Sequence, residues 1–487
     1  MSFLLTIAGH DPTHGAGISA DLATWSAMGL RGASVITTLT TQNSHGLERI
    51  EPVDPHFVRD ALHTLLRDGE PAAIKVGLLG SAAVAREVGD FLAARRCPVV
   101  VDPVLAASNG PRSHADEPAA FRDALLALLR HADVITPNRP EAATVLGLPV
   151  DDAASGAQAL RQLCRGAVVL KGGHDDGTHS LDWVVDAERS AVLGNERLNV
   201  SAHGTGCVFS SVLAGMLASG WDVFEAAAEA KLRVHAGIAQ AQVIGAGRPN
   251  TNPTAQLNSR HLPTLQWLPF DAEARPATAF AAPIAPLGFY PVVDSADWVE
   301  RLLAWGVRTL QLRIKSGTLP SHELRAQIDA AVRAARGVAG AQLFINDHWR
   351  AAIELDAYGV HLGQEDLDHA DFAALQAAGL RLGVSSHTPL EMARAHAVQP
   401  SYVALGPVYP TTLKAMRYPP LGLDRLRDWT RRYQPRYAVV AIGGISLERT
   451  PAVWACGVDA VAVVSAVTQA ARPREAVDAL MRLGRRA

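Results

Sequence analysis

The stretch HGTGCVFSSVLAGMLA at residues 203–218 opens on a glycine-rich turn and continues as a mostly apolar run. From residue 208 onward the apolar positions recur three and four apart, which is the spacing of one helix face. The first N–H groups of such a helix have no intrahelical partner, so the stretch predicts an anion site. We expect Cys207 to have a lowered pKa there and to accept a proton or bond a substrate hydroxyl. The alternative is a tight turn with a small buried cysteine.

The residues before this turn alternate between apolar runs and helical stretches. Loops that carry Gly, Asp, Asn and Lys follow the runs. This alternation predicts a doubly wound α/β sheet whose ligands bind at the carboxyl ends of the strands. The predicted parallel strands cover residues 4–9, 32–40, 72–80, 98–104, 132–138 and 167–173.

Three charged residues stand at the ends of these predicted strands. Lys171 precedes two glycines and could neutralise a phosphate, although a solvated loop lysine fits equally well. Asp102 and Glu141 could hold Mg²⁺ directly or through water, or each could be a helix cap or turn residue. The chain has no GxxxxGK[ST] motif, so the phosphate site is not a P-loop.

The C-terminal part of the chain repeats a strand–helix unit. Eight such units in roughly 200 residues predict a (β/α)₈ TIM barrel with its chemistry at the carboxyl ends of the strands. Seven prolines between residues 248 and 287 indicate a linker, so we expect domains at 1–247 and 288–487. The eight predicted strands cover residues 288–293, 309–314, 342–346, 359–362, 381–386, 402–408, 437–444 and 460–466.

Polar residues gather at the ends of the predicted barrel strands. Gln311, Arg313 and Lys315 alternate along one strand and share a face, which suits a pyrophosphate, although an exposed edge strand would alternate too. Asp347 and Asp366 follow neighbouring strands and could share one Mg²⁺. The late strands fit a phosphate site. Further residues there are Thr411, Lys414, Gly443, Gly444, Val464 and Ser465.

Composition excludes several classes of protein. The 487 residues are 48% hydrophobic and 19% charged, which excludes wholesale disorder. A net charge of −3 gives no support for a nucleic-acid partner. The apolar run at the N-terminus is too short for a signal peptide, and prolines interrupt the longest uncharged run. Four cysteines without CxxC spacing fit a reducing setting, so we expect a soluble, cytoplasmic protein without a membrane segment.

Residues 1–247 resemble the hydroxymethylpyrimidine/phosphomethylpyrimidine kinases of thiamine synthesis, in the ribokinase-like superfamily. The motifs that carry the resemblance are TIAGHDPTHGAGISADLATWSAMG, SVITTLTTQNS, IKVGLLG, VVVDPV, ITPNRPEA, VVLKGGH and HGTGC, in that order. The resemblance implies a ribokinase-like doubly wound α/β sandwich that uses ATP and Mg²⁺. It implies that Cys207 activates the substrate and that the amides of Gly204 to Gly206 stabilise the transferred phosphoryl group.

The same resemblance implies roles for further kinase residues. Lys171 would contact the ATP phosphates, and Asp102 and Glu141 would support Mg²⁺. The residues that would line the aminopyrimidine pocket are Gly9, Asp21, Gln42, Leu78 and Val104.

Residues from about 287 to 480 resemble thiamine-phosphate synthase. The motifs QLRIK, INDHWRAAIELDAYGVHLGQEDL, GVSSH, GPVYPTTLK, AIGGI and VAVVSA occur in the order of that family. The resemblance implies that Asp347 and Asp366 hold Mg²⁺ while pyrophosphate leaves the pyrimidine. The implied diphosphate contacts are Gln311, Arg313, Lys315 and Asn346, with Ser385 and Lys414 at the pyrophosphate and reacting centre. The implied thiazole phosphate contacts are Thr411, Gly444, Val464 and Ser465.

Together the two resemblances predict a bifunctional enzyme of thiamine phosphate synthesis. The kinase half would make the hydroxymethylpyrimidine diphosphate that the barrel half joins to thiazole phosphate. Its partners would be these small molecules and ATP, and by analogy the chain could form a homo-oligomer. One alternative keeps the barrel active and makes the kinase half a pyrimidine-binding regulatory module. A non-catalytic scaffold is the other, which the sets of charged strand-end residues disfavour.

Overall fold

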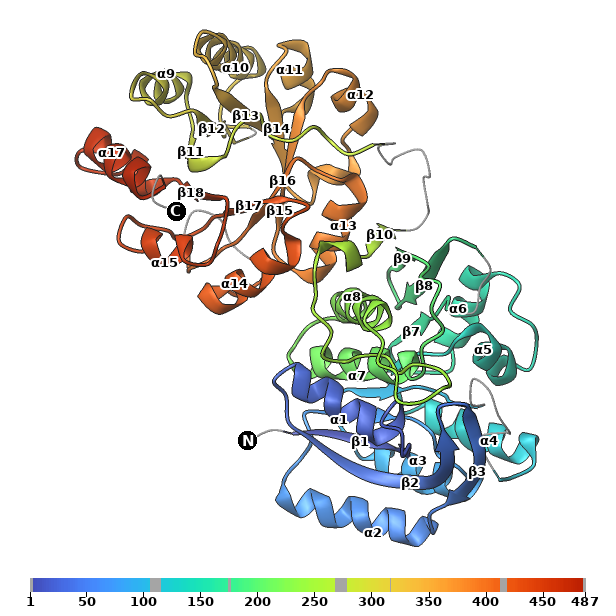
Figure 1. The fold of residues 1–487 in the computed structure, drawn as a ribbon. Coiled ribbons are helices and arrows are strands. Elements are labelled where there is room, and N and C mark those ends of the chain that lie inside the picture. Colours follow the sequence, from blue (N-terminus) through green and yellow to red (C-terminus); the bar gives the residue numbers. More distant parts are fainter. Residues whose placement is uncertain are drawn as a thin grey trace. The chain divides into compact units, whose positions relative to one another are not determined.

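The computed structural model describes residues 3–105, 115–173, 177–267, 278–315, 317–411 and 418–484. Its contacts divide the chain into two compact units, with the main division near residue 270. Figure 1 shows the first unit in blue to green and the second in yellow to red. Each unit is described by itself.

The first unit contains a sheet in which ten strands are described (Figure 1). Its central strands are parallel to one another, as the sequence predicts. The order across the sheet is β10-β9-β8-β7-β6-β5-β4-β1-β2-β3. The central strands are β1 (Leu4–His10), β2 (Gly32–Asn43), β4 (Ala73–Val76), β5 (Val99–Val101), β6 (Val134–Ile135) and β7 (Ala167–Leu170).

Helices cover both faces of this sheet. Helices α2 to α6 pack against one another along the chain on one face, and α1, α7 and α8 contact one another on the other. The first group is α2 (Pro55–Leu65), α3 (Ala82–Ala93), α4 (Pro118–Leu129), α5 (Arg139–Leu146) and α6 (Ala153–Arg161). The second group is α1 (Gly17–Ala27), α7 (Thr205–Ala218) and α8 (Val223–Ala239).

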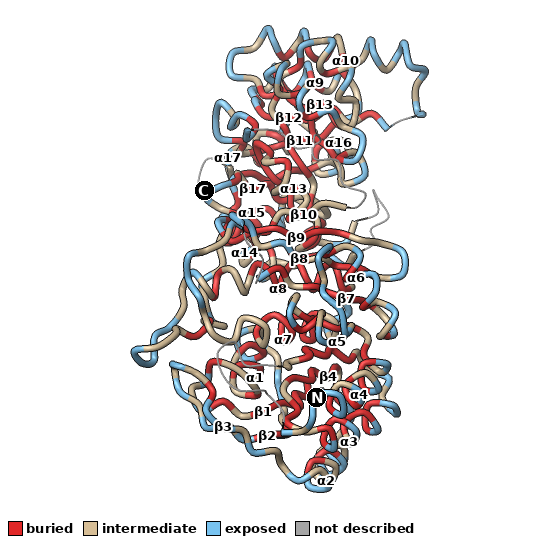
Figure 2. Tube along the Cα trace, turned by 90° about the vertical axis from the view of Figure 1, so that its right-hand side faces the viewer, coloured by how far each residue is buried: buried red, intermediate tan, exposed pale blue. Residues whose placement is uncertain are grey.

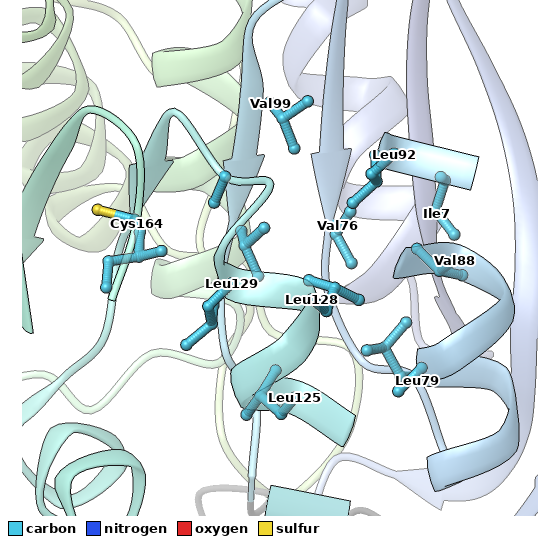
Figure 3. Close-up of a cluster of buried hydrophobic side chains, with 14 of the residues drawn as sticks. Ile7, Val76, Leu79, Val88, Leu92, Val99, Leu125, Leu128, Leu129 and Cys164 are labelled. Carbon is cyan, nitrogen blue, oxygen red and sulfur yellow. The ribbon is translucent and has the colours of Figure 1, made fainter. Parts of the chain in front are cut away.

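The core of the first unit lies between the sheet and the α2–α6 layer. Figure 3 shows strand residues such as Val76 and Val99 facing Leu92 of α3 and Leu128 of α4. All four side chains are fully buried, and each such burial contributes about 1.5–3 kcal/mol. This rigid layer fixes the positions of the loops that leave the carboxyl ends of the strands.

Four strands of the sheet were not predicted. β3 (Gly46–Pro52) pairs antiparallel with β2, and β8 (His179–Val185) and β9 (Ser190–Glu196) extend the other side. β10 (Thr264–Trp267) pairs antiparallel with β9. These outer strands mix polar and apolar residues over short lengths, so their period is weak.

The predicted linker at 248–287 is wrong in its first part. β10 lies inside it, and Trp267 packs its ring against Phe224 of α8 with centroids 5.1 Å apart. Thr251 donates its backbone N–H to the carbonyl of His203 (2.9 Å). The first unit therefore continues to about residue 270. Prolines do not distinguish the two cases, because they occur in edge strands and in the segments that lead into them as well as in linkers.

The second unit is a closed barrel with eight parallel strands among the described residues (Figure 1). All eight predicted strands are present, and four of them end two or three residues early. They are β11 (Gly288–Val293), β12 (Thr309–Leu312), β13 (Gln342–Asn346), β14 (Gly359–Leu362), β15 (Arg381–Ser386), β16 (Tyr402–Leu405), β17 (Ala438–Ala441) and β18 (Ala460–Val463). This arrangement is the (β/α)₈ architecture that the repeat predicts.

Helices follow the barrel strands and surround them. In Figure 2 the strands of both units are mostly red, which marks burial, while blue exposed residues lie on helices and loops. The helices are α9 (Ala296–Ala304), α10 (Ser321–Arg336), α11 (Trp349–Glu354), α12 (Phe372–Ala377), α13 (Pro389–Val398), α14 (Gly422–Tyr433), α15 (Thr450–Trp454), α16 (Ser465–Thr468) and α17 (Pro473–Gly484).

Candidate functional sites

The glycine-rich turn before α7 packs against a second glycine-rich turn before α1. Gly204 is the N-cap of α7 and has φ +80°. A Cβ there would lie 1.6 Å from the carbonyl oxygen of Gly15, so only glycine fits. At Gly206 a Cβ would lie 3.0 Å from Nζ of Lys171 and 3.2 Å from Oδ2 of Asp102. The two charged side chains therefore reach the start of α7 from the sheet.

Asp102, Glu141 and Lys171 come together at this helix start. Lys171 Nζ donates to Asp102 Oδ1 (2.7 Å), which also accepts from Thr136 Oγ1 (3.0 Å). Burial raises the pKa of Glu141 to about 7; the nearby Lys171 opposes the rise and Asp102 adds to it. Two carboxylates and an ammonium beside free helix N–H groups fit a metal-bound nucleotide phosphate.

Glu141 also caps a helix. Its Oε2 accepts from the backbone N–H of Asn138 (2.8 Å), and Asn138 Oδ1 accepts from the N–H of Glu141 (2.9 Å). This is a capping box at the start of α5. The alternative interpretation of Glu141 as a helix cap is therefore confirmed, and the cap fixes its carboxylate beside Asp102.

The expected low pKa of Cys207 is wrong. Burial raises the pKa of its thiol to about 11, although the Lys75 ammonium and the backbone N–H of Gly17 favour the thiolate. Asp21 and Asp102 add to the rise. The free enzyme thus holds a neutral thiol at pH 7, because the helix N-terminus does not offset the lost hydration.

Asp21 does not line a pocket in this structure. Its side chain is fully buried, and its two oxygens accept from Lys75 Nζ (3.0 and 2.9 Å). They also accept from Ser211 Oγ (2.7 Å) and Thr6 Oγ1 (2.5 Å). No contact among the described residues supports a place for Asp21 in the aminopyrimidine pocket: its carboxylate is saturated by the protein and holds a buried lysine near Cys207.

Of the other predicted pocket residues, Gly9 and Leu78 lie side by side, whereas Gln42 and Val104 contact other residues. A Cβ on Gly9 would lie 2.9 Å from the Leu78 side chain, so these two are in contact range. Gln42 Nε2 lies 3.0 Å from Nε2 of His203, which lies 3.0 Å from Asp11 Oδ2. Val104 follows Asp102, and its N–H donates to the Asp102 carbonyl (2.8 Å).

His203 and Asp11 were missed by the sequence reasoning. Their bond lowers the pKa of Asp11 although burial opposes this. The two residues are 192 positions apart, so only the fold brings them together. The sequence does contain one indication of a site: each of the two residues belongs to a glycine-rich motif.

In the barrel, Asp347 and Asp366 meet at the ends of β13 and β14. Asp347 has φ +62°, a conformation that aspartate tolerates better than most residues. Burial and the neighbouring Asp366 carboxylate raise the pKa of Asp347 to about 6. Two carboxylates close enough to share a proton form a donor set that fits Mg²⁺, which takes one or two carboxylates besides phosphate oxygens.

The predicted diphosphate residues differ in burial. Gln311 and Asn346 are buried, Arg313 is half-buried, and Lys315 is exposed. Arg313 acts electrostatically on the Asp347 carboxyl and opposes the rise of its pKa, which places the guanidinium nearby. β12 ends at Leu312, so Arg313 and Lys315 lie on the loop after the strand rather than on it.

The predicted thiazole phosphate residues follow late strands. Gly444 has φ +65°, and a Cβ there would lie 2.6 Å from the carbonyl oxygen of Pro410, next to Thr411. Val464 and Ser465 stand at the start of α16, directly after β18. Lys414 lies outside the described residues.

Ser385 is linked to His361, a polar residue at a predicted strand end for which the sequence predicts no specific role. His361 Nε2 lies 2.8 Å from Ser385 Oγ, and Gln364 Nε2 donates to the Ser385 carbonyl (2.7 Å). Burial, with Arg313 and His387, lowers the pKa of His361 to about 3. In the motif GVHLGQED this histidine directly follows an apolar strand residue, which is its only signal in the sequence.

The two units thus define two phosphate-handling transferase domains, an α/β sandwich of kinase type and a (β/α)₈ barrel with a carboxylate pair. A family model described as phosphomethylpyrimidine kinase matches residues 11–252, and one described as thiamine monophosphate synthase matches residues 289–467. Within the part of the chain described, every helix is too short or too polar to serve as a membrane span.

Relatives of known name agree with this division. The thiamine-phosphate synthase of Pectobacterium atrosepticum is 52% identical over 208 residues, which are 42% of this chain and 96% of the relative. That of Salmonella typhimurium is 56% identical over 195 residues, covering 40% of this chain and 90% of the relative. Through its barrel, the chain belongs to the thiamine-phosphate synthase family.

A solved structure supports the fold of the first unit. The pyridoxal kinase of Staphylococcus aureus, in complex with AMP-PCP and pyridoxal, is 27% identical with a TM-score of 0.50. The match covers 55% of this chain and 99% of that one. The predicted ribokinase-like fold is confirmed. Both transferase domains are present in one chain, which supports the bifunctional interpretation over the monofunctional one.

Proposed function

We propose that this chain carries out consecutive steps of thiamine phosphate synthesis. The first unit transfers phosphoryl groups from ATP to hydroxymethylpyrimidine and then to its phosphate. The barrel joins the resulting diphosphate to thiazole phosphate and releases pyrophosphate. The observation that supports this most is the presence of two clusters of charged and polar residues at strand ends, one around Cys207 and one around Asp347. The free thiols of all four cysteines suit action in the cytoplasm.

In the kinase unit we assign Cys207 as the base for the substrate hydroxyl. A thiol with a pKa of about 11 is a stronger base, once deprotonated, than one with a low pKa. The N–H groups at Gly204 to Gly206 and the Lys171 ammonium stabilise charge on the transferred phosphoryl group. Asp102 and Glu141 would hold Mg²⁺, which neutralises phosphate charge when bound. Gly9, Gln42, Leu78 and Val104 position the pyrimidine.

In the barrel we assign the chemistry to positioning and charge stabilisation. Asp347 and Asp366 would hold Mg²⁺, which stabilises the departing pyrophosphate when bound. Arg313 and Lys315 supply positive charge, and Gln311, Asn346 and Ser385 supply polar contacts. Thr411, Gly444, Val464 and Ser465 hold the thiazole phosphate, and Lys414 completes the set at the reacting centre.

A coupled assay tests the whole proposal. Purified chain supplied with hydroxymethylpyrimidine, ATP, Mg²⁺ and thiazole phosphate should produce thiamine phosphate. A parallel reaction that starts from the diphosphate bypasses the kinase. Product only in the parallel reaction, with pyrimidine binding but no ATP turnover, would instead support a regulatory first unit.

The carboxylate pair predicts how the synthase depends on pH. Asp347, with a pKa of about 6, is protonated below that pH, and Mg²⁺ must displace this proton. The apparent affinity for Mg²⁺ should therefore fall about tenfold per pH unit below pH 6 and stay level above it. Titrating synthase turnover with Mg²⁺ from pH 5 to 8, starting from the diphosphate, measures this.

Asp366→Asn is the matched variant for that titration. Removing the like charge lowers the pKa of Asp347, so the acid limb should move to lower pH while the Mg²⁺ affinity at pH 8 falls. An acid limb that stays at the same pH in this variant would show that another group titrates there.

A further inference from the structure

A chain of buried polar groups crosses the interior of the barrel and ends on Ser385. Gln311 Nε2 donates to the Tyr290 hydroxyl (3.3 Å), which lies 2.8 Å from the Tyr402 hydroxyl. The Tyr402 hydroxyl lies 2.8 Å from His361 Nδ1, and His361 Nε2 lies 2.8 Å from Ser385 Oγ. The five residues come from five different strands. All but Ser385 are buried.

A glycine makes this chain possible. His361 on β14 and Tyr402 on β16 both pair with Gly383 on the strand between them. A Cβ on Gly383 would lie 2.1 Å from the Tyr402 ring. Because Gly383 has no side chain, the Tyr402 ring crosses β15 and stacks on His361 with centroids 5.7 Å apart.

Counting donors gives the chain a direction. The Gln311 N–H can only donate, so Tyr290 accepts it and uses its own hydrogen toward Tyr402. Tyr402 then donates to Nδ1 of His361. His361 is buried with a hydroxyl at each ring nitrogen. An imidazolium there would be a buried charge without a carboxylate bonded to it, so the ring is neutral. Its single N–H is therefore on Nε2 and donates to Ser385.

The reversed direction fits the ligand poorly. It would require the Gln311 amide to be turned over, and the Ser385 hydrogen would then be used on His361. The Ser385 oxygen would face the diphosphate, whose oxygens only accept. In the direction counted above, Ser385 accepts from His361 and keeps its hydrogen for an anion.

We propose that Tyr402 and His361 are positioning residues that hold Ser385 as a hydrogen-bond donor to the diphosphate, with His361 as the Nε2–H tautomer. This inference rests on the proposed role of Ser385 in the synthase reaction. Neither residue needs to touch the substrate. Their contribution is to fix the rotamer of Ser385 and the direction of its O–H bond before the ligand arrives.

Nitrogen NMR of the full chain labelled in its histidine rings tests the tautomer directly. The His361 signals are identified by their loss in His361→Gln. We expect Nε2 to carry the proton and Nδ1 to be unprotonated. Tyr402→Phe removes the donor to Nδ1, so the ring of this variant should no longer be held as one tautomer and should populate both. A proton on Nδ1 in the unchanged protein would overturn the proposal, and this readout does not depend on synthase activity.

Kinetics of the synthase step, starting from the diphosphate, test the positioning role. A glutamine amide can place its N–H near imidazole Nε2, whereas an asparagine amide reaches only the Nδ1 position. We expect Ser385→Ala to lower kcat by about 100-fold or more. His361→Asn should cause a loss of the same size, and His361→Gln should retain much more activity. Equal losses in the two His361 variants would contradict the proposal.

Tyr437→Phe is the matched control. Tyr437 is also a buried barrel tyrosine bonded to a histidine, since its hydroxyl lies 2.6 Å from His396 Nδ1, but it is not part of the chain. It should leave synthase kcat and KM unchanged. If Tyr437→Phe and Tyr402→Phe lower activity alike, the effect is general barrel stability and the proposal fails. If the unchanged protein lacks synthase activity, the proposed function fails while the tautomer measurement still stands.

Discussion

Replacing Cys207 by alanine should lower kinase turnover by about 10²–10⁴-fold, the range for loss of a general base. The thiol lies at the start of α7, near the Gly17 N–H and the buried Lys75, which both favour its thiolate. Once the thiol has lost its proton to solvent, the thiolate can take a proton from a substrate hydroxyl. Synthase turnover from the diphosphate should not change, because that site is built from barrel residues. Following ADP formation and thiamine phosphate formation in separate reactions measures both.

Cys97→Ala is the control for this prediction. Cys97 is another half-buried free thiol of the same unit, and burial raises its pKa too. It follows α3 and is not part of the cluster around α7. The variant should keep both activities. Equal losses of kinase and synthase turnover in Cys207→Ala would show that the assignment is wrong.

The sequence was most informative where a period extends over whole elements. The eight barrel strands begin within one residue of their predicted positions, because each is a short apolar run bounded by helix signals. β3, β8, β9 and β10 carry mixed residues at the outer part of the sheet, and β10 also lies among prolines. These strands form because they pair with neighbouring strands of the sheet. The local spacing of apolar residues carries no information about that pairing.

The same limit applies to the candidate sites. Charged residues at the ends of predicted strands do lie close together in the structure. Asp102, Glu141 and Lys171 form one such group, and Asp347 and Asp366 form another. The pKa of Cys207 was wrong because a helix N-terminus is visible in sequence and the burial of the thiol is not. The contact between His361 and Tyr402 was not predictable from a local pattern. It forms because Gly383, on the strand between them, has no side chain and leaves space for the Tyr402 ring.

Lys75→Met should destabilise the first unit by about 3–5 kcal/mol. Lys75 and Asp21 are both fully buried, and burial opposes the charge of Lys75, but the Asp21 carboxylate more than compensates and raises its pKa. Without the ammonium, the carboxylate stays buried with the hydroxyl donors Thr6 and Ser211 but without a positive charge beside it among the bonds of the described residues. Hydrogen exchange of β4 peptides in the full chain should rise, with barrel peptides as an internal reference.

The double variant Asp21→Asn with Lys75→Met separates structure from chemistry. It leaves no buried charge, so exchange of β4 should return most of the way to that of the unchanged protein. Pyrimidine affinity should be retained, because protein donors saturate the Asp21 carboxylate. Kinase turnover should stay lowered, since the cation that favours the Cys207 thiolate is gone. A loss of pyrimidine binding in a stable double variant would instead return Asp21 to the pocket.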